Sequence, residues 1–295
     1  MGLLRRKRTI HNLKQNTMPK TLSPLVSVSE LMALQHNKDL ILVDAGAQKR
    51  QPPFLEGAVG VDLETQLSDI KEDAAQGGRH PLPTVAQFAK VLGHLGIGPN
   101  SHVVIYDDMR GGNAAARFWW MLTAVGHAKV QVLNGGAQQA IQKGYPQSDR
   151  LASPTPVEDY PVTEWQLPRA TMAEVEQASQ SQDQIIIDVR AAKRYAGEFE
   201  PIDLLAGHIP NAINVPFEDN LQADGRFKSP SELRQKYREI LGNVPKDHVT
   251  VHCGSGVTAC HTLLALAHAG IDIPKLYVGS WSEWSRNELP FLVGS

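Results

Sequence analysis

The sequence predicts an α/β protein made of two tandem domains, each a parallel sheet flanked by helices. Three observations lead to this fold class. The length of 295 residues suits two domains of about 100–200 residues each. Short β-branched runs end at polar residues, which is typical of strands buried on both faces of a parallel sheet. Most of these runs occur twice in the same order, which indicates an internal repeat.

The two halves contain matching elements. Each half is expected to hold two strands, a helix and a further strand, at 40–44, 101–107, 113–127 and 130–136 in the first half and at 185–189, 247–253, 257–270 and 275–280 in the second. Asp44 and Asp188 are 144 residues apart, as are Gly135 and Gly279. The segments 56–58 and 210–212 match at an offset of 154, so the first crossover alone differs much in length. This alternation predicts a parallel sheet in each half.

Prolines between the two halves give the domain boundaries. Pro154, Pro156, Pro161 and Pro168 exclude a regular helix or a central strand there. We therefore expect a basic tail over 1–21, a first domain over 22–150, a linker over 151–168 and a second domain over 169–295. Helical periodicity resumes at Thr171, which together with Glu174 has the spacing of a capping box.

The beginning of the chain is basic and contains no carboxylate before Glu30. Its six cationic residues are Arg5, Arg6, Lys7, Arg8, Lys14 and Lys20. The rest of the chain holds 29 − 6 = 23 basic and 31 acidic residues, a net charge of −8. Such a start fits an organelle transit peptide, a disordered tail, or a start codon upstream of a true start at Met18. It lacks the apolar core of a secretory signal, so export is not expected.

The composition excludes several classes of function. A net charge of −2 gives no indication of nucleic-acid binding, and no run of about eighteen apolar residues predicts a membrane-spanning helix. The two cysteines, Cys253 and Cys260, are too few for a disulfide framework and favour a reducing compartment. We expect a cytoplasmic monomer, with a mitochondrial location as the alternative if the tail is a transit peptide.

The loop after the strand at 247–253 has the features of a nucleophilic site. A strand leads into Cys253, a Gly254-Ser255-Gly256 turn follows, and a helix is expected to begin near Val257. The glycines allow several N–H groups to converge on one point, and the helix N-terminus adds positive potential there. Such sites lower a thiol pKa from about 8.5 to roughly 3.5–7.5. The alternative is a cysteine that is merely buried packing; the glycine turn favours the nucleophile.

Other chemistry at this loop is less well supported. Cys260 lies among apolar residues of the expected helix and is interpreted as core. A metal site from His252, Cys253, Cys260 and His261 lacks the usual short ligand spacing, so no metal or other cofactor is expected. A cysteine phosphatase would need an arginine where the chain has Ala259, and without it the phosphoryl group loses its main clamp.

The repeat supplies an internal control for the cysteine. The position in the first half that matches Cys253 is Asp107, and a carboxylate cannot act as a sulfur nucleophile. We therefore expect the first domain to keep the scaffold without the chemistry. The active site should belong to the second domain and be covered by the first.

Four segments resemble the two-domain sulfurtransferases of the rhodanese and 3-mercaptopyruvate sulfurtransferase family. They are 188–195 (DVRAAKRY), 207–217 (GHIPNAINVPF), 253–260 (CGSGVTAC) and 279–284 (GSWSEW), and the likeness covers about 22–295. It implies a tandem rhodanese fold with a catalytic cysteine in the second domain alone. It also implies that Cys253 takes sulfur from a small anionic donor, becomes a persulfide, and passes the sulfur to a thiol, cyanide or a reduced redox protein.

The resemblance also assigns roles within the site. Arg194 stands where the family has its substrate-binding arginine, whereas Arg190 is interpreted as a structural ion-pair partner. The loop backbone at Gly254, Gly256, Val257 and Thr258 would bind the substrate or persulfide anion. Two residues of the first half are expected near the site: His80 in GGRHPLP should reach the cleft, and Glu64 stands where related enzymes have an aspartate. His252 is interpreted as structural. Core or domain-interface packing is assigned to Trp119, Trp120, Trp281 and Trp284.

The loop sequence bears on the choice of donor. By resemblance, Cys-Gly-Ser-Gly is typical of mercaptopyruvate enzymes, and Ser255 can donate or relay a proton to the enolate leaving group. Mercaptopyruvate enzymes usually have a second arginine before the GHIP motif, and 198–206 contains none. We therefore expect an enzyme that uses 3-mercaptopyruvate, with thiosulfate as the alternative main donor. The alternative that is not an enzyme is a persulfide carrier or docking module.

Overall fold

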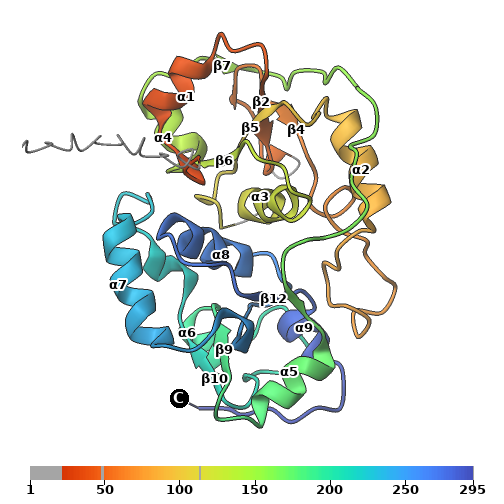
Figure 1. Ribbon diagram of the computed structural model, residues 1–295, viewed down its shortest axis with the longest axis vertical. Coiled ribbons are helices and arrows are strands. Elements are labelled where there is room, and N and C mark those ends of the chain that lie inside the picture. Colours follow the sequence, from red (N-terminus) through yellow and green to blue (C-terminus); the bar gives the residue numbers. More distant parts are fainter. Residues whose placement is uncertain (1–21, 48–49, 113, 295) are drawn as a thin grey trace, which may run out of the picture.

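A computed structural model describes residues 22–47, 50–112 and 114–294. The predicted tail over 1–21 lies outside the described residues. Two α/β units follow one another, the first in the upper half of Figure 1 and the second in the lower half. The predicted fold class is confirmed.

The first unit is a five-stranded parallel sheet in the order β1-β6-β5-β2-β4. Its strands are β1 (Leu25–Val26), β2 (Leu40–Asp44), β4 (Val59–Gly60), β5 (His102–Tyr106) and β6 (Val130–Leu133). A small antiparallel pair, β3 (Phe54–Leu55) and β7 (Gln147–Ser148), lies beside it. The helices are α1 (Val28–Leu34), α2 (Val85–His94), α3 (Ala114–Ala124) and α4 (Gly136–Gln142).

The second unit repeats this topology with the order β8-β12-β11-β9-β10. Its strands are β8 (Arg169–Ala170), β9 (Ile185–Asp188), β10 (Ala212–Asn214), β11 (Val249–His252) and β12 (Lys275–Tyr277). Its α-helices are α5 (Met172–Ser179), α6 (Ala192–Tyr195), α7 (Pro230–Leu241), α8 (Ala259–His268) and α9 (Ser280–Trp284), with 3-10 turns at Phe217–Asn220 and Lys246–His248. The central strands β5 and β11 therefore occupy equivalent places, and their carboxyl ends carry Asp107 and Cys253.

Three details differ from or refine the sequence prediction. The strands expected over 130–136 and 275–280 end at Leu133 and Tyr277, because glycines follow. The helix expected to begin near Val257 begins at Ala259, so the cysteine loop is longer than predicted. The capping box at Thr171 is confirmed, with its hydroxyl accepting from the Glu174 N–H at 3.2 Å.

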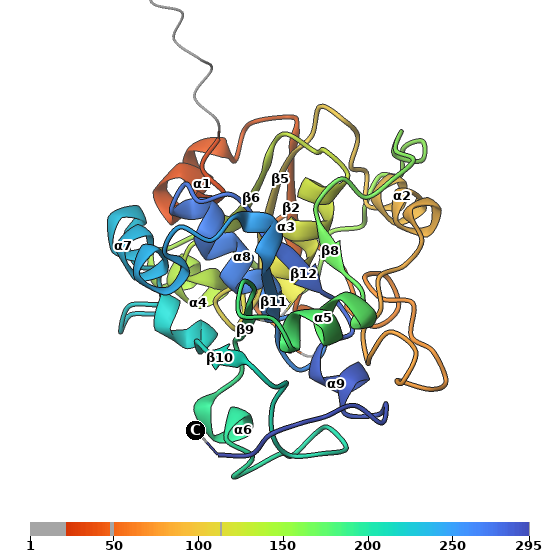
Figure 2. The same ribbon diagram turned by 60° about the horizontal axis from the view of Figure 1, so that its bottom comes forward.

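The two units share one buried core. Helices α3 and α8 lie side by side at the boundary in both ribbon views (Figures 1 and 2). One hydrophobic cluster runs continuously through both units and includes Phe118 from α3 and Leu263 from α8. Because the carboxyl end of β11 opens onto this boundary, the cysteine loop lies between the two units.

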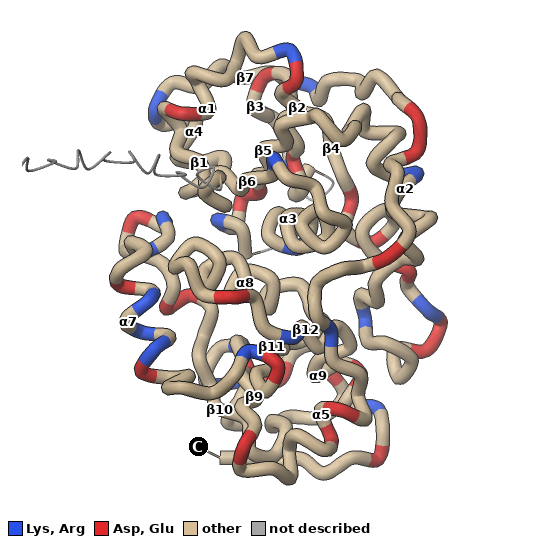
Figure 3. The backbone as a smooth tube through the Cα atoms, in the orientation of Figure 1, with Lys and Arg blue, Asp and Glu red and all other residues tan. Residues whose placement is uncertain are grey.

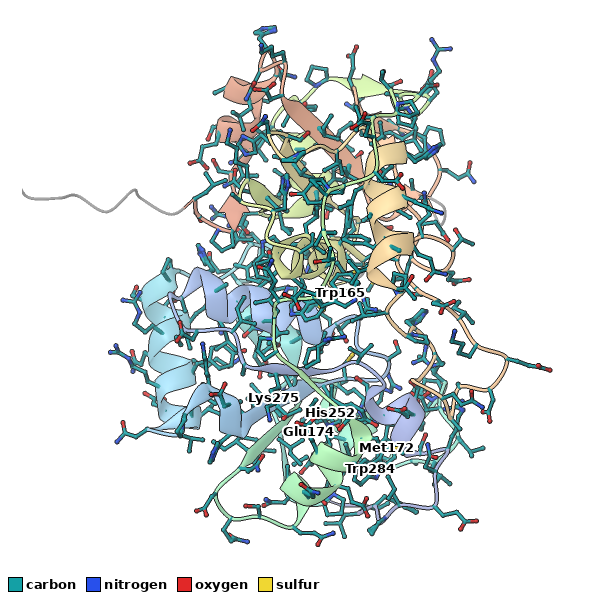
Figure 4. All side chains as sticks on the ribbon, turned by 45° about the vertical axis from the view of Figure 1, so that its right-hand side comes forward. Trp165, Met172, Glu174, His252, Lys275 and Trp284 are labelled. Carbon is teal, nitrogen blue, oxygen red and sulfur yellow. The ribbon has the colours of Figure 1, made fainter. Side chains whose placement is uncertain are left out.

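The chain between β7 and β8 has no helix or strand, and the structure describes all of it. Trp165 in this stretch packs on the first unit, with its ring 5.3 Å from Phe88 and 6.3 Å from Trp120 (Figure 4). In the second unit, Glu174 of α5 and Lys275 of β12 are 3.6 Å apart. We propose 151–168 as the linker between domains over 22–150 and 169–295.

The charged residues do not gather on one face. Figure 3 shows basic and acidic positions interspersed over both units in that view. Among the described residues, no helix is long and apolar enough to span a bilayer.

Candidate active site

Cys253 begins a tightly held loop between β11 and α8. Cys253 is buried, with 1% of the residue exposed. Gly256 has a φ of +73°, and a Cβ there would lie 2.4 Å from the carbonyl oxygen of Val278. Only glycine fits that backbone, because other residues disfavour positive φ and the space is already filled. Gly256 therefore fixes the curl of the loop.

The loop presents backbone donors that lack acceptors. Within the described residues, no N–H group from Gly254 to Ala259 donates to a protein acceptor, although the loop is almost wholly buried. Buried N–H groups without partners are rare, and converging ones bind anions. The loop thus provides a cradle for a negative charge beside the Cys253 sulfur.

The equivalent loop of the first unit shows how such a cradle is filled. There the Asp107 carboxylate accepts from the N–H groups of Met109 (2.9 Å), Gly111 (2.7 Å) and Ala115 (3.1 Å). The chain has thus placed its own anion in the first loop. In the second loop Cys253 replaces that aspartate and leaves the donors open.

Helix α9 holds the cysteine loop from behind. The Ser280 hydroxyl accepts from the Cys253 N–H at 3.1 Å. The N–H groups of Trp281 and Ser282 donate to the carbonyls of Cys253 (3.0 Å) and Gly254 (2.8 Å). No role was predicted for Ser280 and Ser282. Their place in the GSWSEW motif is the sequence signal that could have indicated one.

The first unit supplies the other wall of the site. His80 Nδ1 and Ser255 Oγ share a hydrogen bond of 2.8 Å, so these two predicted residues meet although 175 positions separate them. Arg117 of α3 donates to the carbonyls of Gly256 (3.2 Å) and His80 (3.1 Å). It therefore joins the two loops. No role was predicted for Arg117. The sequence signal that could have indicated one is an arginine inside an otherwise apolar helical stretch.

Arg117 is fully buried and forms no ion pair among the described residues. Burial lowers the pKa of its guanidinium, while the nearby Cys260 and Cys253 sulfurs act in the opposite direction. A cation held this way by two carbonyls contributes positive potential to the boundary next to Cys253.

Arg194 and Arg190 lie in one ion-pair network but differ in burial. Arg190 is buried and donates to Asp188 (2.6 Å) and Glu200 (3.3 Å), as expected of a structural ion pair. Arg194 is 18% exposed and contacts Glu200 (2.7 Å) and Asp203 (3.1 Å). Its two terminal nitrogens lie 3.5 Å from where a Cβ on Gly254 would stand, so this guanidinium faces the cysteine loop.

The remaining predicted residues lie in the cysteine loop, after β4 and at the end of β11. Val257 is buried and Thr258 partly exposed in the loop, next to the N-terminus of α8. Glu64 is exposed on the chain after β4, where its N–H donates to Asp62 at 3.1 Å; its place in the cleft stays a prediction. His252 is buried, with its Nε2 3.8 Å from Oδ2 of Asp188, and its structural role stays a prediction.

The second cysteine and its neighbours belong to the core. Cys260 is fully buried, and burial raises the pKa of its thiol to about 12. Burial also lowers the pKa of His261 to about 3. In the parts of the chain that the structure describes, no three His, Cys, Asp or Glu side chains converge as metal ligands. The four tryptophans that were assigned to packing are all buried.

The comparison with protein families matches both units. The rhodanese-like domain model matches residues 27–143 and 171–287. The chain belongs to the rhodanese family. The predicted two-domain enzyme of this family is thereby confirmed.

The names of the relatives of this rhodanese-family chain refer to two sulfur donors, 3-mercaptopyruvate and thiosulfate. It is 39% identical over 273 residues to a probable 3-mercaptopyruvate sulfurtransferase of Pseudomonas aeruginosa, covering 88% of this chain and 94% of that one. It is 38% identical over 213 residues to the thiosulfate sulfurtransferase of Gallus gallus, covering 71% and 72%. Among solved structures, the Escherichia coli 3-mercaptopyruvate sulfotransferase has a TM-score of 0.71 and 30% identity, covering 89% and 100%.

A substitution at Arg117 tests whether the boundary cation serves the site or the fold. We expect Arg117→Met to lower sulfur-transfer efficiency about 10–100-fold, the scale of losing a charged hydrogen-bonding group. The same variant should change the unfolding temperature little, because removing an unpaired buried charge offsets the loss of the hydrogen bonds to the carbonyls of Gly256 and His80. Activity and thermal unfolding are measured together, with Arg117→Lys as the charge-preserving control. A lowered unfolding temperature with unchanged activity per folded molecule would assign Arg117 to the fold alone.

Proposed function

We propose that this protein transfers a sulfur atom from 3-mercaptopyruvate to a thiol or cyanide acceptor through a persulfide on Cys253. The observation that carries the proposal is the open cradle of N–H groups after Cys253, whose counterpart in the first unit is filled by the Asp107 carboxylate. A persulfide anion on Cys253 would occupy the cradle as that carboxylate does.

The sulfur transfer is a two-step exchange. The Cys253 thiolate attacks the donor sulfur, an S–S bond forms, and the carbon–sulfur bond breaks with its electron pair moving to carbon. The thiol proton of the donor passes to that carbon, so pyruvate leaves and Cys253 carries a persulfide anion. An acceptor thiolate or cyanide then attacks the outer sulfur and releases the Cys253 thiolate.

The side chains of Arg194, Ser255 and His80 take part in this reaction. Arg194 meets the donor carboxylate, since its guanidinium faces the cysteine loop and a planar fork fits a carboxylate. The Ser255–His80 pair relays the proton to the enolate carbon, because the two are hydrogen-bonded at 2.8 Å. The N–H groups of the cradle stabilise the negative charge on sulfur, and no side chain has to change its protonation state for this.

Thiosulfate is the second candidate donor. The guanidinium of Arg79 lies beside that of Arg194 at the same loop, and two cations suit a doubly charged anion. A relative is also named for thiosulfate. We further propose, on the sequence alone, a monomer in the cytoplasm, with the mitochondrion as the alternative location.

The test is steady-state sulfur transfer from 3-mercaptopyruvate and thiosulfate side by side, each with cyanide and with a dithiol acceptor. We expect turnover with both and a higher kcat/KM for 3-mercaptopyruvate. Higher efficiency with thiosulfate would reverse the assigned donor. If neither donor turns over but intact-protein mass spectrometry still finds a Cys253 persulfide, the protein is a carrier.

Replacing Ser255 tests how the loop selects its donor. We expect Ser255→Lys to shift the ratio of kcat/KM values toward thiosulfate by about tenfold or more, because an added cation favours the dianion and the enolate loses its proton relay. Ser255→Met is the matched control, since it has similar length without charge. An unchanged ratio in the lysine variant would refute the assigned role of Ser255.

A further inference from the structure

Ser280, the first residue of α9, connects the nucleophile to the neighbouring strand of its sheet. The pairing of β11 with β12 ends at Val251 and Leu276. Beyond this pair, the Cys253 N–H donates to the Ser280 hydroxyl at 3.1 Å, and that hydroxyl donates to the Tyr277 carbonyl at 2.8 Å. The hydroxyl therefore bridges the two strands after their last backbone pair and holds Cys253 at the end of the sheet.

The backbone of Ser280 is strained. Its φ is +54°, and among the residues that the structure describes only three non-glycine residues have a positive φ. The matching position of the first unit, 280 − 144, is Gly136, whose φ is +65°. Glycine adopts this conformation readily, whereas a residue with a Cβ does not. A strained residue persists where its surroundings hold it, and here the hydroxyl that glycine lacks is bonded to the nucleophile.

The next two residues of α9 set the direction of the loop peptides. The Trp281 N–H donates to the Cys253 carbonyl at 3.0 Å, and the Ser282 N–H donates to the Gly254 carbonyl at 2.8 Å. Both of these loop peptides are trans. The C=O and N–H of a trans peptide point to opposite sides. The N–H groups of Gly254 and Ser255, the first two donors of the cradle, therefore point away from α9.

Helix α9 is itself held on its other sides. Its Trp281 is fully buried and donates from Nε1 to the Leu205 carbonyl at 2.8 Å. The Ser282 hydroxyl accepts from the N–H of Arg79 at 3.0 Å, in the chain of the first unit that descends beside α9 in Figure 1. Because hydrogen bonds to both units hold it, α9 provides a fixed support for the cysteine loop.

We propose that Ser280 is a positioning residue for the nucleophile, whose hydroxyl holds the Cys253 backbone so that the N–H groups of the following loop converge on the sulfur. This rests on the proposed sulfur transfer. Ser280 acts through Cys253 and does not touch the donor, because it is fully buried and its hydroxyl is bonded within the protein. The first unit, which has Asp107 in place of the cysteine, has Gly136 at this position and no hydroxyl there.

Replacing Ser280 by glycine removes the hydroxyl and the strain together. We expect Ser280→Gly to lower kcat about tenfold and to change KM for the donor less than about twofold. The loss is smaller than the roughly 10²–10³-fold cost of removing an oxyanion donor, because the N–H groups remain and lose only their orientation. The unfolding temperature should change little, since relief of the strain offsets the lost hydrogen bonds. A role in the fold alone would lower the unfolding temperature and leave kcat per folded molecule unchanged.

Two further variants separate the hydroxyl from the strain. Ser280→Ala removes the same hydroxyl but keeps a Cβ at positive φ, so it should lose as much kcat as Ser280→Gly and unfold at a lower temperature. Ser285→Ala is the matched control at the end of α9, where the hydroxyl has no hydrogen-bond partner among the described residues, and it should keep the kcat of the wild type. Full kcat in Ser280→Gly, or an equal loss in Ser285→Ala, would overturn the positioning role.

Sulfur release from a preloaded enzyme distinguishes failure of this proposal from failure of the assigned donor. Inorganic polysulfide loads Cys253 when the thiolate attacks its terminal sulfur, an S–S bond forms and a shorter polysulfide leaves. Cyanide then attacks the outer sulfur, so that thiocyanate forms and the Cys253 thiolate is released.

This release is measured as thiocyanate in a single turnover, without an organic donor. It should be about tenfold slower in Ser280→Gly than in the wild type, because the leaving thiolate is less well stabilised. An unchanged rate would overturn the positioning role even if 3-mercaptopyruvate is turned over normally. Slower release in an enzyme that uses neither 3-mercaptopyruvate nor thiosulfate would support the positioning role and refute the proposed donors instead.

Discussion

Cys253→Ser is expected to reduce sulfur transfer from either donor to background, a loss of more than about 10⁴-fold on the scale of nucleophile removal in other enzymes. A serine hydroxyl is not ionised at neutral pH and cannot hold sulfur as a persulfide. The variant should keep its fold, because the side chains are nearly equal in size and the Cys253 N–H still donates to Ser280. Steady-state transfer and intact-protein mass spectrometry measure the loss of turnover and of persulfide.

Cys260→Ser is the matched control for that experiment. Cys260 is buried in α8, and the raised pKa of its thiol keeps it protonated. Its replacement should retain turnover and lower stability by about 1–3 kcal/mol, because a more polar hydroxyl is buried there with the Gly256 carbonyl as its acceptor. If Cys253→Ser retained wild-type activity, or Cys260→Ser alone abolished the persulfide, the assignment of the nucleophile would be wrong.

The largest effect on stability is expected from Asp188→Asn. Asp188 is fully buried and pairs with Arg190, whose guanidinium is also buried. Removing one partner of a buried pair costs about 3–5 kcal/mol, and here it leaves Arg190 with Glu200, at 3.3 Å, as its remaining carboxylate partner. Calorimetric unfolding measures the loss. The control is Asp44→Asn at the matching position of the first unit, where the partner Arg50 is 13% exposed and the cost should be smaller.

The same pair predicts how stability depends on pH. Burial acts to raise the pKa of Asp188, but the charges of His252 and Arg190 and the hydrogen bonds from Arg190 outweigh it, so the pKa is lowered. Its contribution is therefore present above the unfolded-state pKa of about 3.9 and is lost as pH falls through the lower folded-state value. The stability gap between wild type and Asp188→Asn should shrink on acidification below about pH 4. A gap that stays constant down to about pH 2 would show that packing, not charge, holds this site.

The sequence determined what local patterns encode. Strands such as 185–189 could be predicted because buried parallel strands are continuous β-branched runs, and the helix cap at Thr171 because its partner is three residues away. The repeat made Asp107 and Cys253 comparable, so the amino-acid sequence was enough to predict which half holds the nucleophile. Arg194 and Ser255 were predicted from motifs that lie within one loop or one helical turn.

The tertiary structure alone decided which distant residues join that loop. Arg79 and Asp203 are 124 residues apart, and Arg117 and Gly256 are 139 apart. A basic residue in a loop belongs to no periodic pattern that would indicate its function. The sequence around an isolated arginine also does not indicate which distant residue it contacts. Their roles arise because the carboxyl ends of the central strands meet the opposite domain, and because burial there requires each charge and carbonyl to find a partner. The sequence therefore predicted the nucleophile, and the docking of the two domains determined which charged residues surround it.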